Sequence, residues 1–88
     1  MISVKERFII KRLAGRYHAK RVLLFGSSLE KRKARDIDLA VEGLPAKDFF
    51  GFYGELMFSL PKPVDLIDLS KDSQFTRLVR REGLPIYG

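Results

Sequence analysis

Two aspartates one residue apart, Asp36 and Asp38, begin an apolar run and follow a glycine-serine pair and a basic segment in LFGSSLEKRKARDIDLAVEG, residues 24–43. Side chains at positions i and i+2 of a strand project from the same face, about 6–7 Å apart. Two ionised carboxylates at that spacing repel each other unless a positive charge lies between them. Oxygen-only ligands suit magnesium or manganese, so the spacing predicts a divalent-cation site.

The glycine-serine pair, Gly26 and Ser27, ends the preceding apolar run. Glycine lets a backbone approach a ligand closely, and N–H groups at a following helix start bind anions, so the pair is a candidate phosphate site. A second interpretation stays open, because residues 27–30 (SSLE) also fit a capping box in which Ser27 is only a helix cap.

A third carboxylate is expected from the segment PVDLIDL, residues 63–69, where Asp65 and Asp68 lie three positions apart. Residues three apart face opposite sides of a regular strand, so only one of them joins Asp36 and Asp38. Asp68 lies near the strand end and is explained as a turn or cap residue. An aspartate between two apolar strand residues is costly unless it is paired or metal-bound, which favours Asp65.

The elements that position these residues follow from hydrophobic periodicity and from turn signals. The expected order is a helix over 4–17 opened by a Ser3–Glu6 capping box, a strand over 21–26, a short helix within 28–33, a strand over 36–42, a helix over 47–60, a strand over 63–69, a helix ending at Gly83, and an edge strand at 85–87. This alternation predicts an α/β fold of the α+β type, with a mixed open sheet of three core strands plus a short edge strand, covered by helices.

Two apolar stripes at helical spacing are expected to face the core. They are Val4, Phe8, Ile9, Leu13 and Tyr17 in the first helix, and Phe49, Tyr53, Leu56, Met57 and Leu60 in the second. An aromatic stripe of this kind is more typical of a core than of a ligand site.

The length and composition set limits on the function. A chain of 88 residues with 45% hydrophobic residues predicts one domain over residues 1–88 with a small core, so any site is shallow or is closed by a partner. Cysteine is absent, which excludes disulfides and thiolate chemistry. No run approaches the ~18 apolar residues of a membrane span, and we expect a soluble cytoplasmic protein without membrane contact.

The net charge of +6 is distributed unevenly. Residues 1–35 contain eleven lysines and arginines against two acids, a net of +9, whereas residues 36–88 contain six against nine, a net of −3. A cationic end of the molecule attracts phosphates, RNA or an acidic protein surface, although a solvated basic helix face is an equally good explanation.

The motifs GS, DIDLAV, PVDLIDL and the closing REGLPIY, in this order, resemble the nucleotidyltransferase superfamily that includes DNA polymerase β. They look most like its minimal nucleotidyltransferases, which are small single-domain proteins. The resemblance covers nearly the whole chain and implies the polymerase β-like nucleotidyltransferase fold.

This resemblance implies transfer of a nucleoside monophosphate, AMP from ATP or NMP from another NTP, to a hydroxyl. On that template Asp36 and Asp38 bind two Mg²⁺ ions (or Mn²⁺), and Asp65 completes the acceptor-side metal and helps to deprotonate the attacking hydroxyl. Gly26 and Ser27 hold the phosphates. The implied partner is a HEPN-domain toxin, for which the nucleotidyltransferase is the antitoxin.

Two alternatives to such an enzyme remain. The same fold can neutralise its partner by occupancy with a vestigial site. The other is a nucleic-acid binding or modifying protein, which the basic residues suggest. Direct nucleic-acid binding is disfavoured because the aromatic residues at 49–58 lie in the acidic half of the chain, so basic and aromatic residues do not alternate to form a base-stacking surface. The sequence leaves nucleotide preference, acceptor and homo-oligomerisation open.

Overall fold

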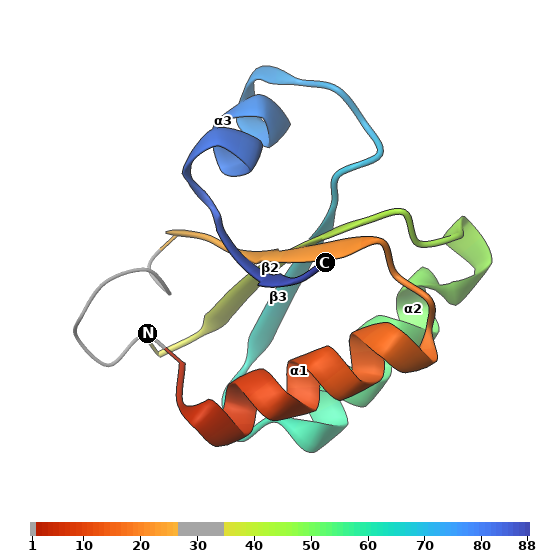
Figure 1. Ribbon diagram of the computed structural model, residues 1–88, viewed down its shortest axis with the longest axis vertical. Coiled ribbons are helices and arrows are strands. Elements are labelled where there is room, and N and C mark those ends of the chain that lie inside the picture. The colour runs from red at the N-terminus through yellow and green to blue at the C-terminus, as the bar shows by residue number, and fades with distance from the viewer. Residues whose placement is uncertain (1, 27–34) are drawn as a thin grey trace.

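The computed structural model describes residues 2–26 and 35–88, and these residues form three helices and four strands (Figure 1). In chain order they are α1 (Val4–Arg16), β1 (Arg21–Leu24), β2 (Ile37–Glu42), α2 (Ala46–Ser59), β3 (Val64–Asp68), α3 (Gln74–Glu82) and β4 (Leu84–Tyr87). Every expected helix and strand within the described residues is present, with bounds that differ by one or two residues. The short helix expected within 28–33 lies outside the described residues.

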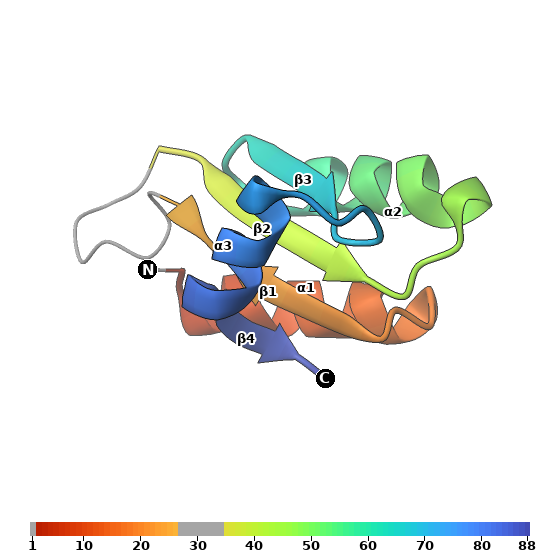
Figure 2. The same cartoon turned by 90° about the horizontal axis from the view of Figure 1, so that it is seen from above.

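The four strands form one mixed sheet in the order β3-β2-β1-β4, as Figure 2 shows from above. β1 pairs antiparallel with both β2 and β4, and β2 pairs in parallel with β3. A parallel pair needs a long crossover connection, and α2 provides it. Helices α1 and α2 cover one face of the sheet, and α3 lies over the other (Figure 1). This α+β architecture confirms the predicted fold class.

Alternation along the strands divides the buried apolar residues between the two faces of the sheet. The larger cluster lies on the face of α1 and α2 and includes Ile37, Leu39 and Phe52. The smaller cluster lies on the face of α3 and consists of Leu23, Ala40, Leu69 and Val79, with Phe25 and Ile67 packed against it. The α3 face therefore has less apolar cover, which leaves room on it for polar side chains.

The predicted core face of α1 is partly wrong, because the helix is rotated relative to the expected stripe. Val4 and Phe8 are exposed, at 87% and 62%, whereas Ile10 and Ala14 are fully buried. The capping box itself is confirmed: the Glu6 N–H donates to Ser3 Oγ at 3.1 Å, and the Ser3 N–H donates to Glu6 Oε1 at 2.8 Å.

The predicted stripe of α2 is also partly wrong. Leu56 and Leu60 are buried as expected, but Met57 is 57% exposed and the fully buried aromatic residue is Phe52. Aromatic side chains surround this helix, so several stripes have helical spacing and the periodicity alone does not select the buried one.

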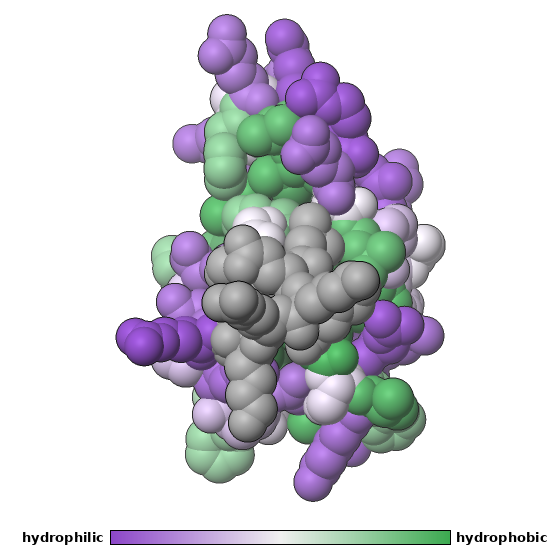
Figure 3. Space-filling model, turned by 90° about the vertical axis from the view of Figure 1, so that its left-hand side faces the viewer, coloured by the Kyte–Doolittle hydropathy of each residue, from purple (hydrophilic) through white to green (hydrophobic). Residues whose placement is uncertain are grey.

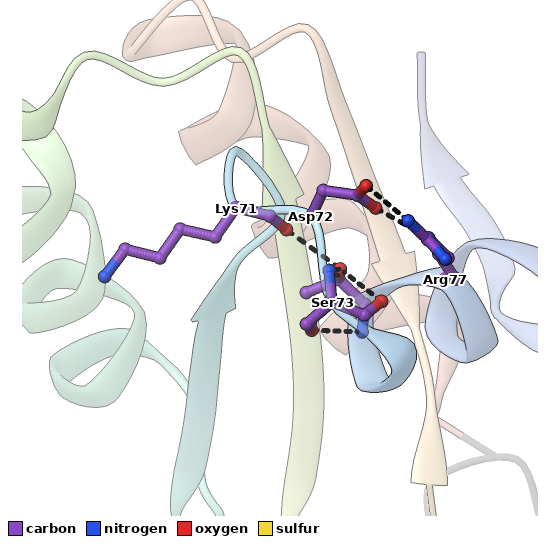
Figure 4. A network of polar contacts seen from close by, with 5 residues as sticks. Lys71, Asp72, Ser73 and Arg77 are labelled. Carbon is purple, nitrogen blue, oxygen red and sulfur yellow. Dashed lines mark hydrogen bonds and ion pairs between the residues drawn. The ribbon is translucent and has the colours of Figure 1, made fainter.

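Helix α3 is capped at its start and is joined to the sheet further along its length. A capping box joins Ser73 and Thr76, and Arg77 donates two hydrogen bonds to Asp72, at 2.9 and 2.7 Å (Figure 4). Further along, Arg80 forms an ion pair with Glu42 of β2 at 2.6 Å and donates to the Leu69 carbonyl. The Arg80 hydrogen bond lowers the pKa of Glu42. These contacts hold α3 in one position over the sheet.

Candidate functional site

One end of the sheet brings together three strand termini. Because β1 runs antiparallel to β2, the residues after β1 lie beside the start of β2, and the Phe25 N–H donates to the Asp38 carbonyl at 3.0 Å. Because β3 runs parallel to β2, Asp65 lies directly opposite Asp38 in the register. Gly26, Asp38 and Asp65 therefore form a row across β1, β2 and β3.

The carboxylates of Asp38 and Asp65 project from the same face of the sheet. Ile37 and Leu39, on either side of Asp38, are buried in the core under α1 and α2, so Asp38 points to the α3 face. Asp65 is likewise preceded and followed by buried apolar residues of that core. Neighbouring strands lie about 4.8 Å apart, which places the two carboxylates side by side.

The register selects Asp65 rather than Asp68 as the neighbour of Asp38. Asp68 lies opposite Val41, further along β2, and its Oδ1 accepts a hydrogen bond from the Ser70 N–H at 2.9 Å. Asp68 is thus a turn residue, as the sequence indicated. The physical reason given for Asp65 was wrong, however: Asp65 is exposed on an edge strand, so burial does not oblige it to find a partner.

The other two predicted site residues lie at the margins of the described site. Asp36 is exposed and comes one residue before β2, so its orientation is not set by the pleat of the strand. Ser27 lies outside the described residues. The strand geometry therefore places Asp38 and Asp65 next to each other but does not do so for Asp36 and Ser27, and the roles of all four residues stay predictions.

Gly26 lies directly against the Asp38 carboxylate. Its backbone has φ +65°, in the left-handed region that favours glycine, and a Cβ added there would lie 2.8 Å from Asp38 Oδ2. The conformation therefore favours glycine, and any larger residue would have to push the Asp38 carboxylate aside. The sequence indicated a close backbone approach at this position; the structure identifies the group that is approached as a carboxylate.

Substituting Gly26 with alanine is expected to destabilise the fold by about 1–2 kcal/mol, since a non-glycine residue in the left-handed region costs that much. The new Cβ should also displace the Asp38 carboxylate. Gly54→Ala is the matched control, because a Cβ there meets nothing within 4 Å and alanine favours the helix. Urea unfolding checks both variants, and a Gly26→Ala protein as stable as Gly54→Ala would contradict the prediction.

A divalent metal fits the donor chemistry of this site. Within residues 2–26 and 35–88, no three acidic or histidine side chains are close enough to form a metal site by themselves. Magnesium is commonly held by one or two carboxylates together with waters and the phosphates of a substrate. Asp38 and Asp65 would supply such carboxylates.

One part of the site was not found from the sequence. Phe25, Phe75 and Leu78 line a pocket next to Gly26, and no motif in the sequence indicated it. Phe75 and Leu78 remain partly exposed, at 52% and 41%. Periodicity reports the apolar side of a helix, but it does not say which apolar residues are left uncovered.

No protein-family model and no curated protein matches the sequence. Among solved structures, a chain from a crystal structure of the toxin-antitoxin MntA-HepT superposes with a TM-score of 0.74 at 24% identity, over 98% of this chain and 73% of that chain. A second chain comes from a mutant complex in which two aspartates two positions apart are replaced by glutamate. It superposes with a TM-score of 0.73 at 26% identity, over 94% of this chain and 72% of that chain. A third chain, from a toxin-antitoxin structure with AMP-PNP, superposes with a TM-score of 0.72 at 26% identity, over 93% of this chain and 73% of that chain.

The chain has the fold of the minimal nucleotidyltransferases. The resemblance predicted from the four motifs is confirmed at this level, because nearly the whole chain superposes on these neighbours. In the part of the chain that the structure describes, the row of Gly26, Asp38 and Asp65 lies on a sheet face that α3 covers only in part. None of the helices in residues 2–26 and 35–88 is long and apolar enough to cross a membrane.

Proposed function

We propose that this chain is a magnesium-dependent nucleotidyltransferase of a toxin-antitoxin pair, which transfers AMP from ATP to a hydroxyl of its partner protein. The observation that carries the proposal is the in-register pair of Asp38 and Asp65, with the Gly26 backbone against Asp38. The structural neighbours support it, since they come from toxin-antitoxin complexes and one of these contains AMP-PNP. The partner on this view is a HepT-like HEPN-domain toxin.

We give each substrate one side of the site, and the strand order supports this division. Gly26 lies on the β1 side of Asp38, which is the side that we assign to the phosphates of the nucleotide. Asp65 lies on the β3 side, at the exposed edge of the sheet, where a large acceptor has access. Asp38 lies between them, on the central strand of the three.

In the proposed reaction, Asp65 orients the acceptor hydroxyl and receives its proton. The hydroxyl oxygen forms a bond to the α-phosphorus of ATP while the bond from that phosphorus to the bridging oxygen of pyrophosphate breaks. Asp36, Asp38 and Asp65 would hold the magnesium ions, which when bound stabilise the attacking and leaving oxygens of such an in-line displacement. The products are an adenylylated partner and pyrophosphate.

Transfer of label from α-³²P ATP to a co-purified partner tests the proposal. We expect labelled partner with Mg²⁺ and none with excess EDTA, because the carboxylates alone do not neutralise the developing charge. ATP labelled at the γ-position is the matched control and should leave the partner unlabelled. Label transferred in EDTA, or from the γ-position, would contradict the proposed chemistry.

The same assay separates catalysis from neutralisation by occupancy. If the partner toxin is inhibited without any labelled product, and inhibition persists when both Asp36 and Asp38 are alanine, the chain acts as a binding module. A catalytic antitoxin requires that this double variant lose inhibition together with transfer.

A further inference from the structure

An apolar pocket of about 260 Å³ opens between the end of β1 and helix α3. Its lining is Phe25, Gly26, Phe75, Leu78, Val79, Glu82 and Gly83. Figure 3, which views the molecule from the side where β1 ends, shows hydrophobic residues gathered below the hydrophilic upper end that α3 forms. An apolar hollow with a polar rim is the usual form of a small-ligand site.

The pocket is continuous with the proposed active site. Gly26 belongs to both, since it lines the pocket and its backbone lies against the Asp38 carboxylate. The Phe25 N–H donates a hydrogen bond to the Asp38 carbonyl, and the Phe25 ring packs against the apolar cluster on the α3 face. A ligand that reaches from Asp38 past Gly26 on this face therefore enters the pocket.

Aromatic rings form the walls of the pocket. Phe25 and Phe75 meet edge to face, with ring centroids 5.9 Å apart and an interplanar angle of 78°. Phe75 is 52% exposed, so much of its ring is free to stack against a planar ligand. The volume is below the range of about 300–1,000 Å³ typical of drug-sized ligands, and it suits a single planar ring system.

The α3 wall is held in place before any ligand arrives. Arg80 ties the helix to Glu42 on β2 and to the Leu69 carbonyl, and Val79 is buried against Leu23. A preformed wall lowers the ordering cost of binding. The exposure of Phe75 is therefore a fixed feature of the fold.

We propose that this pocket is the nucleobase subsite, in which the base of the donor nucleotide stacks on Phe75 beside Leu78. The inference rests on the proposed function, since it places the base of the same nucleotide whose phosphates lie at Gly26. It also assigns α3 a role in nucleotide binding that none of the sequence motifs indicated.

Calorimetric titration with AMP-PNP and, separately, with inorganic tripolyphosphate, both in Mg²⁺, tests the subsite. Phe75→Ala should weaken AMP-PNP binding by about tenfold or more, because stacking a base on an aromatic side chain typically contributes that much. Tripolyphosphate affinity should stay within about twofold, since it has no base. Phe58→Ala is the matched control, because Phe58 is 92% exposed on α2. Leu78→Glu is a second variant, at a partly exposed position, and it should weaken AMP-PNP binding by a similar factor.

The outcomes separate the two proposals. Wild-type protein that binds neither ligand overturns the nucleotidyltransferase function and the subsite with it. If the wild-type protein binds AMP-PNP and the Phe75→Ala and Leu78→Glu variants bind it with the same affinity, the subsite alone is overturned. Variants that lose partner binding while they retain AMP-PNP affinity would also overturn the subsite, because the pocket would then be a protein-docking surface.

Discussion

Asp38→Asn is expected to reduce AMP transfer by about 10³-fold or more, with the fold intact. Asparagine keeps the shape of the side chain but removes the negative charge from the central position of the row. Metal-assisted stabilisation of the transition state contributes several kcal/mol, and each 1.36 kcal/mol corresponds to tenfold in rate. Initial rates of labelled AMP transfer to the partner measure the effect, and thermal unfolding verifies that the variant is folded.

Asp68→Asn is the matched control for this substitution. Asp68 lies three residues after Asp65 in the same strand, and its Oδ1 only accepts a hydrogen bond from the Ser70 N–H. An asparagine oxygen accepts the same bond, so both transfer and stability should be nearly unchanged. Equal losses in the two variants would show that the assignment of Asp38 and Asp65 from the register is wrong.

Phe52→Ala is expected to lower the free energy of unfolding by about 3–5 kcal/mol, the usual cost of removing a buried phenylalanine. Phe52 is fully buried in α2 and packs against Tyr17 of α1, with ring centroids 5.6 Å apart. Domains of this kind have a total stability of about 5–15 kcal/mol, so the variant should be close to unfolding. Urea denaturation followed by circular dichroism measures the change.

Phe58→Ala serves as the control on the same helix. Phe58 is 92% exposed, and a surface substitution usually changes stability by less than about 0.5 kcal/mol. Phe52→Leu should be intermediate because it leaves a smaller cavity. If Phe58→Ala proved as costly as Phe52→Ala, the orientation of α2 would have to be revised.

Local patterns in the sequence were sufficient to predict the elements and the fold family. Capping residues begin α1, apolar runs mark the strands, and Gly83 follows α3, because each of these signals acts within a few residues of the chain. The choice of Asp65 over Asp68 was also correct in its placement, since residues three apart face opposite sides of a strand. The four motifs led to the fold that the structural neighbours confirm.

Orientation about a helix axis was less predictable. Val4 and Phe8 were expected in the core and are exposed, and Met57 was chosen where Phe52 is buried. Hydrophobic residues occur around the whole of α2, so a helical period fits more than one face. Contact with α1 and the sheet decides which of these faces is buried.

The sequence by itself was enough to predict the candidate site residues: the glycine before the basic segment, the Asp-x-Asp pair and the aspartate in the third strand. Only the tertiary structure decided how they meet. The antiparallel pairing of β1 with β2 places Gly26 against Asp38, and the parallel pairing of β2 with β3 places Asp65 beside it. The pocket next to them depends on α3, held to β2 through Arg80 and Glu42. These contacts join residues that are distant in the chain, so they depend on which strands pair and in which direction, and a reading of each segment by itself does not give that.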